Sequence, residues 1–227
     1  MVQIHPPQPK DCMKLGYSNL VEHLDGGSIR AYVSETRIAR ESLKIGPNSI
    51  DVSLHPKIYI PKCESRDAHL VGCVLDPYAY HNPDLYWTEH TASEETPFLL
   101  RTQTFALASV NERFECDQDT TTPDLAIAQM YEGRSTLARI GIASHLSAGF
   151  GDVGFSGAFT LELYNHSPWD ILLRPGMRVG QVAFEYVIGV GKGETYDGAY
   201  SMAEHKNGPV RPALGRERFI APTAIPY

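Results

Sequence analysis

Hydrophobic and polar positions alternate with a period of two in several segments of this chain of 227 residues. The alternation follows Pro47 in "SIDVSLHPKIYIP" (49–61) and recurs in "FALASVNERFEC" (105–116), "SGAFTLELYN" (156–165) and "RVGQVAFEYVIGV" (178–190). Because successive side chains of a strand point to opposite faces, this pattern predicts half-buried β-strands. Short strands separated by Pro, Gly and Asp favour a sandwich, jelly roll or distorted barrel over a parallel α/β sheet.

Other segments break this rhythm. "YSNLVEHLDGG" (17–27) predicts a helix stopped by two glycines, and "WDILLRPGM" (169–177) predicts a strand followed by a tight turn at "RPG". Residues 62–97 form a long, polar, irregular insert, which is typical of a lid or a subunit-packing element. Residues 190–227 are rich in glycine and charge and predict a closing tail. Residues 1–15 are expected to be a disordered N-terminal extension.

Composition places the chain among ordinary globular proteins, with 42% hydrophobic and 21% charged residues, and predicts one domain over 1–227. The chain lacks a run of about 18 apolar residues and a signal-peptide pattern, so we expect a cytoplasmic protein without a membrane partner. Its net charge of -7 argues against a nucleic-acid partner. Any polyanionic ligand must therefore meet a local cluster of positive charge.

Such a cluster occurs in "EGRSTLARIGI" (132–142), which contains Arg134, Ser135, Thr136 and Arg139. A glycine before these residues lets backbone N–H groups and hydroxyls converge on an anion, while a guanidinium supplies charge and fork geometry. The combination suits a di- or triphosphate. The alternative is a short run of Arg and Ser on a solvated helix.

A second stretch, "SAGFGDVGFSGAFTLELYN" (147–165), contains two carboxylates. Asp152 lies in a glycine-punctuated turn, and Glu162 lies between Leu161 and Leu163 in the following strand. Strand alternation places Glu162 on the face opposite the two leucines. If that face is open, Glu162 is a surface residue. If it lies in a cleft, desolvation should raise the pKa of Glu162 and suit it to proton transfer near pH 7.

Four stretches together resemble the deoxycytidine triphosphate deaminases, a family within the trimeric dUTPase-like superfamily. In family order these are "SIDVSL", "EGRSTLARIGI", "AGFGDVGFSGAFTLELYN" and "LRPGMRVGQVAF". The resemblance implies a mostly β, dUTPase-like distorted barrel or jelly roll with a few short helices. It also implies a homotrimer with active sites between subunits. A simple dUTPase lacks the counterparts of both Arg139 and Glu162, so this chain looks like a deaminase.

The resemblance also implies catalytic roles. Glu162 would take a proton from the attacking water, protonate N3 of cytosine and help ammonia leave. Ser135 and the backbone carbonyl of Ala148 would hold the water and the exocyclic amine. Arg139 would orient the water and Glu162.

Further residues are implied to bind the substrate dCTP. Asp152 would accept the sugar 3′-hydroxyl, and Phe155 would pack on the deoxyribose where a 2′-hydroxyl would not fit. The other implied substrate-binding residues are Arg134, Ser135, Thr136, Leu146, Gln181, Tyr196 and Lys206. The sequence departs from the family at Gly151 and Val153, which stand where a branched apolar residue and proline or alanine are usual, and this predicts a looser turn around Asp152.

The cofactor expected is Mg²⁺ bound through the nucleotide triphosphate, without a dedicated protein cage. Zinc is not expected, because the chain lacks the H-x-E…P-C-x-x-C signature of zinc-dependent deaminases. The reaction expected is hydrolytic conversion of dCTP to dUTP and ammonia in pyrimidine deoxynucleotide metabolism. One alternative is a bifunctional enzyme that continues to dUMP and pyrophosphate, since "SAGF" resembles the "TAGF" style of such members. Another is a non-catalytic nucleotide-binding or regulatory homologue.

Overall fold

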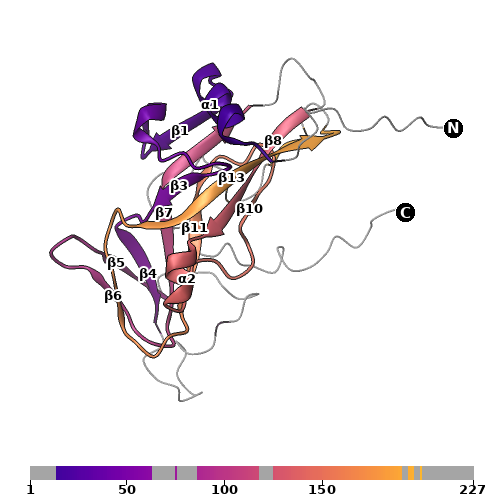
Figure 1. Cartoon of the computed structure of the whole chain (residues 1–227). Helices are drawn as coiled ribbons and strands as arrows, with labels where there is room; N and C mark the ends of the chain where they lie inside the picture. Colours follow the sequence, from indigo (N-terminus) through magenta and orange to yellow (C-terminus); the bar gives the residue numbers. More distant parts are fainter. Residues whose placement is uncertain are drawn as a thin grey trace, which may run out of the picture.

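Two antiparallel β-sheets enclose the apolar core of the protein (Figure 1). The computed structural model describes residues 14–62, 75, 86–117, 125–190, 194–196 and 200. The larger sheet contains β1 (Ile29–Val33), β2 (Thr36–Arg37), β4 (Lys57–Pro61), β5 (Trp87–Thr91), β7 (Phe105–Cys116), β9 (Ile142–Ala143) and β11 (Gly157–Asn165). The smaller sheet contains β3 (Ile50–Ser53), β8 (Leu125–Gly133), β10 (Phe150–Gly151) and β13 (Arg178–Ile188).

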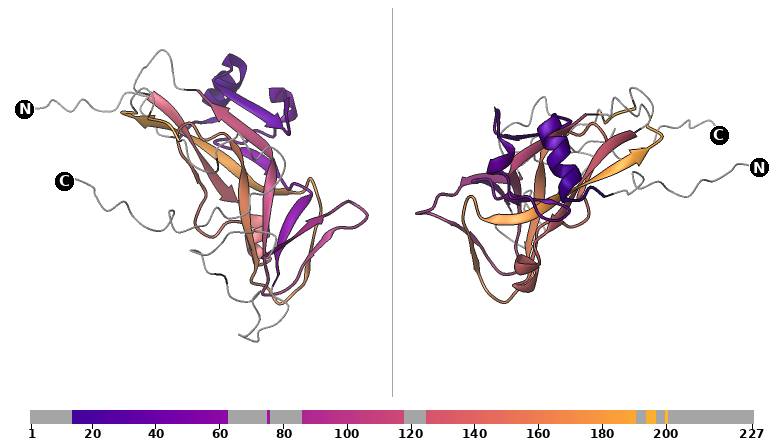
Figure 2. Two further views of the ribbon diagram at one scale, coloured as in Figure 1. Left: turned by 180° about the vertical axis from the view of Figure 1, so that it is seen from behind. Right: turned by 45° about the horizontal axis from the view of Figure 1, so that its top comes forward.

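Short elements complete the described part of the chain. They are a two-stranded ribbon of β6 (Phe98–Leu100) and β12 (Ile171–Leu173), and the helices α1 (Tyr17–Gly26), η2 (Arg40–Ser42) and α2 (Ser135–Arg139). Figures 1 and 2 show α1 at one end of the sheets, with β4, β5 and β6 at the other. The prediction of a mostly β fold with a few short helices is confirmed. Among the described strands the sheets stay open rather than closing into a barrel.

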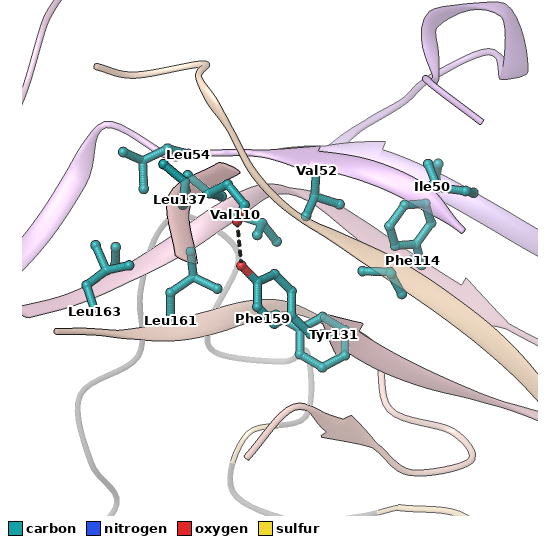
Figure 3. Packing of buried hydrophobic residues seen from close by; sticks show 14 of the residues in the cluster. Ile50, Val52, Leu54, Val110, Phe114, Tyr131, Leu137, Phe159, Leu161 and Leu163 are labelled. Carbon is teal, nitrogen blue, oxygen red and sulfur yellow. Dashed lines mark hydrogen bonds between the residues drawn. The ribbon is translucent and has the colours of Figure 1, made fainter. Parts of the chain in front are cut away.

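The core lies between the sheets, because the apolar positions of the alternating strands face inward. Residues of β11 alternate strictly between buried and half-buried along its whole length. Leu161 and Leu163 point into the core, together with Leu137 from α2 and Phe114 from β7 (Figure 3). Fully burying one such side chain contributes about 1.5–3 kcal/mol. Leu137 thereby anchors a helix that is too short to be stable alone.

Two local predictions are confirmed. Helix α1 buries Leu20 and Leu24 and ends at the two glycines, where the Gly27 N–H bonds the Leu24 carbonyl at 3.3 Å. The "RPG" segment forms a turn between β12 and β13, closed by a 3.2 Å hydrogen bond from the Met177 N–H to the Arg174 carbonyl. Gly176 has a φ of 77°, a conformation that the third position of a type II turn requires and that glycine adopts at low cost.

The insert at 62–97 is more regular than its sequence predicts. Residues Trp87–Thr91 form β5 and pair antiparallel with β4 over five positions. Trp87 is buried against Leu107 and Phe105, and its ring centroid lies 6.2 Å from that of Phe105. The irregular insert was therefore a wrong prediction for this part, because "WTEHT" pairs with "KIYIP" and extends the larger sheet.

Other expectations fall outside the described residues. These cover the N-terminal extension up to residue 13, most of the insert between 63 and 85, and most of the tail after residue 190. For residues 14 and 15 the prediction of a disordered extension was wrong, because Leu15 is buried and its N–H donates to the Phe184 carbonyl at 2.8 Å. Within the described ranges, no helix is long and apolar enough to cross a membrane.

Candidate active site

Glu162 lies half-buried on the outer face of the larger sheet. The register of β11 against β7 places it directly across from Leu107, which is buried beneath Trp87. Burial raises the pKa of Glu162 above its usual value, and a 3.2 Å hydrogen bond from the Leu146 N–H partly opposes this. The sequence left open whether the face of Glu162 is open or lies in a cleft, and the structure shows this side chain half-buried. A carboxyl with a raised pKa suits a group that must both accept and donate a proton.

The loop that precedes β10 lies beside this carboxyl. Besides Leu146 it contributes His145, which lowers the pKa of Glu162 slightly by electrostatic attraction. The His145 ring meets the Tyr131 ring edge-to-face at 5.5 Å, and its Nδ1 is buried without a hydrogen-bond partner among the described residues. Ala148 follows in the same loop and is exposed. Of the residues predicted here, Leu146 contacts Glu162 directly through its N–H, and Ala148 lies two residues further along the same loop.

Gly149 fixes the position of this loop against β8. The Tyr131 N–H donates to the Gly149 carbonyl at 2.6 Å, and a Cβ added at Gly149 would lie 2.6 Å from the Tyr131 carbonyl oxygen. No side chain fits at that distance without moving the backbone. Tyr131 itself is buried, donates to the Val179 carbonyl at 3.2 Å, and has its pKa raised to about 12 by burial. The two residues join the loop beside Glu162 to a rigid strand.

Helix α2 presents Ser135, Thr136 and Arg139 to solvent, because Leu137 takes its buried side. In the described part of the chain, Glu162 accepts a hydrogen bond from the Leu146 N–H and makes no hydrogen bond or ion pair with Arg139. The structure therefore does not bring Ser135 and Arg139 into contact with Glu162 inside one described subunit. Arg139, which is exposed, and Glu162, which is half-buried, can therefore each be reached by a neighbouring molecule.

Arg134 and Gln181 have partners from β3. Arg134 Nη1 donates to Asp51 Oδ2 at 2.8 Å, and Arg178 Nη1 donates to the same oxygen at 3.0 Å. Gln181 lies across from Asp51 in the sheet, and its Oε1 accepts a 2.7 Å hydrogen bond from the Ser49 hydroxyl. Both predicted phosphate ligands are thus held in place by residues of the "SIDVSL" stretch.

Asp152 and Phe155 lie on one closed turn. The Phe155 N–H donates to the Asp152 carbonyl at 2.8 Å, so the turn is hydrogen-bonded despite Gly151 and Val153. The expectation of a looser turn is therefore not met. The Tyr196 N–H bonds the Val153 carbonyl at 2.8 Å, and the Tyr196 ring meets the Phe155 ring at 5.9 Å. The Asp152 side chain stays exposed beside Phe155.

Two residues of this region were not predicted as part of the site. Asp51 could have been found from strand alternation, because Ile50 and Val52 are buried and Asp51 must face the other side with Gln181. Nothing in the sequence around Arg178, apart from its positive charge, indicated that it belongs to the site. Lys206, predicted to contact the triphosphate, lies outside the described residues.

Comparisons with known proteins agree with the motifs. A family model for dCTP deaminase-like proteins matches residues 23–187. A relative from Methanosphaera stadtmanae, named "dCTP deaminase, dUMP-forming", is 31% identical over 71% of this chain and 78% of that protein. A protein of the same name from Pseudarthrobacter chlorophenolicus is 36% identical over 69% of this chain and 75% of its own length.

A structural comparison gives the same fold. The crystal structure of 2′-deoxycytidine 5′-triphosphate deaminase from Agrobacterium tumefaciens superposes with a TM-score of 0.53 at 16% sequence identity. The match covers 78% of this chain and 49% of that chain. Identity this low supports the shared fold alone.

Proposed function

The chain belongs to the dCTP deaminase-like family, and on this premise we propose that it converts dCTP and two water molecules to dUMP, ammonia and pyrophosphate. Relatives named as dUMP-forming favour this product over the dUTP expected first from the sequence. The bifunctional enzyme, which the sequence offered as an alternative, is therefore preferred to an enzyme that only deaminates dCTP. The observation that carries the proposal is the half-buried Glu162 beside the Leu146–Ala148 loop.

The first step is hydrolytic deamination at C4 of cytosine. Glu162 takes a proton from the water as it attacks C4, and delivers a proton to N3, so that the tetrahedral intermediate carries no full negative charge. Glu162 then moves the proton of the C4 hydroxyl to the amine, the bond between C4 and the amine nitrogen breaks, and ammonia and dUTP are released. Burial of Glu162 supports this role, because its raised pKa favours a carboxyl that can be reprotonated during the cycle.

The second step is attack of water on the α-phosphorus of dUTP. The bond to the bridging oxygen breaks, and pyrophosphate leaves with the electron pair, which gives dUMP. Asp152 is the carboxylate we assign to the sugar 3′-hydroxyl and to the second water, since its side chain is exposed beside Phe155 on a hydrogen-bonded turn. Mg²⁺ enters as part of the substrate, bound to the triphosphate oxygens.

The active site is proposed to form between subunits of a homotrimer. The positions of Ser135 and Arg139 support this, because both are exposed on α2 and neither contacts Glu162 in the described part of one chain. Mixing two inactive variants tests it. Subunits carrying Arg139→Gln and subunits carrying Glu162→Gln should regain about a quarter of wild-type activity when combined, because some shared sites then contain both native residues. Absence of any regain refutes a shared site.

The product profile tests the function itself. Purified protein is incubated with dCTP, dUTP or CTP and Mg²⁺, and ammonia, pyrophosphate and nucleotides are quantified by chromatography and coupled assays. We expect dUMP from both dCTP and dUTP, and little turnover of CTP. Accumulated dUTP with no pyrophosphate would identify a deaminase alone. Nucleotide binding without any product would identify a non-catalytic homologue.

A further inference from the structure

One carboxylate joins two arginines at a corner of the smaller sheet. Asp51 Oδ2 accepts hydrogen bonds from Arg134 Nη1 at 2.8 Å and from Arg178 Nη1 at 3.0 Å. The cross-strand partner of Asp51 is Gln181, and Gln181 also pairs with Glu132 near the end of β8. Residues far apart in sequence are thus gathered where β8 leads into α2.

The exposures of these side chains differ in a way that suits an anion. The Asp51 side chain is 19% exposed, whereas those of Arg134 and Arg178 are 31% and 53% exposed. The Asp51 side chain is therefore the more buried of the three, and both arginine side chains reach solvent in part. One carboxylate neutralises only one of the two positive charges. Each planar guanidinium has several further N–H donors in the fork geometry that matches phosphate oxygens.

We propose that Arg178 is a second cationic ligand of the nucleotide's phosphates, and that Asp51 is a positioning residue that holds Arg134 and Arg178 side by side. This rests on the proposed function, since the triphosphate is the anion. During cleavage of dUTP, negative charge develops on the departing pyrophosphate. Cations already fixed by Asp51 stabilise that charge without reorganising at the moment of reaction. The chemistry at C4 of cytosine needs neither residue.

Arg178→Gln tests the ligand, with Arg174→Gln as its matched control. Arg174 lies just before β13, is 46% exposed, and pairs with Glu94 at 3.5 Å. Each variant thus loses an exposed arginine and one ion pair. We expect Arg178→Gln to raise the KM for dCTP and dUTP about tenfold and to slow pyrophosphate release by about the same factor. The kcat for ammonia release should stay within about twofold, and Arg174→Gln should match wild type.

Direct binding of inorganic tripolyphosphate, measured by calorimetry, gives a readout that needs no turnover. Arg178→Gln should weaken this binding about tenfold relative to wild type and to Arg174→Gln. Equal binding by Arg178→Gln and wild type overturns Arg178 as a ligand, even in an active enzyme. If wild-type protein released no ammonia, the proposed function would fail, and the same binding comparison would still decide the role of Arg178.

Asp51→Asn tests whether Asp51 positions the two arginines, separately from the effect of its negative charge on anion binding. This variant removes a negative charge, so tripolyphosphate should bind at least as tightly as it does to wild type. Pyrophosphate release from dUTP should nevertheless fall about tenfold, because the guanidiniums are no longer fixed. Thermal unfolding checks that the variant is folded. A folded Asp51→Asn protein with full pyrophosphate release overturns the positioning role.

Discussion

Replacing Glu162 with glutamine should separate the catalytic use of this side chain from its cost to stability. Glutamine keeps the shape and an acceptor for the Leu146 N–H, but it cannot carry a proton between the water and N3. General acid–base catalysis is worth about two to four orders of magnitude, so ammonia release from dCTP should fall by about 100- to 10,000-fold. Nucleotide binding should change little.

The stability of this variant should rise at neutral pH. Burial raises the folded-state pKa of Glu162 above its ordinary 4.5, so the ionised carboxylate is less favourable in the folded state than in the unfolded one. The stabilising contribution of the protonated form is complete below the unfolded pKa and is lost as pH rises through the folded pKa. Each unit of difference corresponds to about 1.4 kcal/mol. Glutamine avoids this loss, and the gain should vanish below about pH 4.

The assay combines ammonia release with thermal unfolding at several pH values. Glu22→Gln is the control, because Glu22 is exposed on α1, at the end of the fold away from β4 and β5 (Figure 1). A Glu162→Gln protein that keeps more than a tenth of wild-type activity refutes the proton-shuttle role. A variant that unfolds at a lower temperature than wild type at neutral pH, but not at acid pH, refutes the reasoning from burial.

Two further predictions follow from packing around the site. Gly149→Ala should destabilise the protein by about 1–3 kcal/mol, because its Cβ would fall 2.6 Å from the Tyr131 carbonyl oxygen, and a lower melting temperature in calorimetry is the expected result. Gly26→Ala, whose Cβ would meet nothing within 4 Å, is the control that should leave the melting temperature unchanged or higher. Phe155→Ala should lower the ratio of kcat/KM for dCTP to that for CTP by about tenfold, because the family resemblance places this ring where a 2′-hydroxyl would have to fit. An unchanged ratio would show that another residue selects the sugar.

The sequence predicted which face Glu162 occupies, but not what covers that face. Alternation in "TLELY" was sufficient to place Glu162 opposite the buried Leu161 and Leu163. Its burial depends on Leu107, which lies across from it on β7, and on the Leu146 N–H, which comes from a loop. These contacts arise from strand register and loop packing, which a single sequence does not specify. Strand alternation therefore left both an open surface and a cleft possible for Glu162.

The insert shows the same limit for secondary structure. Residues 87–91 alternate only briefly, and a short alternating run in a polar setting is weak evidence for a strand. The run becomes β5 because β4 offers an unpaired edge and because Trp87 finds an apolar surface on Leu107 and Phe105. Tertiary packing thus decides a segment whose local preference is weak.

The ion pairs of Arg134 and Arg178 with Asp51 show why the charge of a site cannot be judged from one segment of the sequence. "EGRSTLARIGI" displays its cations locally, yet the carboxylate that binds Arg134 lies 83 residues away, and the second arginine on that carboxylate lies 127 residues from it. In a protein of net charge -7, Asp51 cancels part of the positive charge that the segment seemed to offer. In the proposed role of Arg134 and Arg178, a triphosphate is therefore bound by the fixed geometry of two arginines rather than by a broad positive field. Fields of exposed charges decay over about 10 Å at ordinary salt concentrations, so the cluster acts once the nucleotide is already in the site.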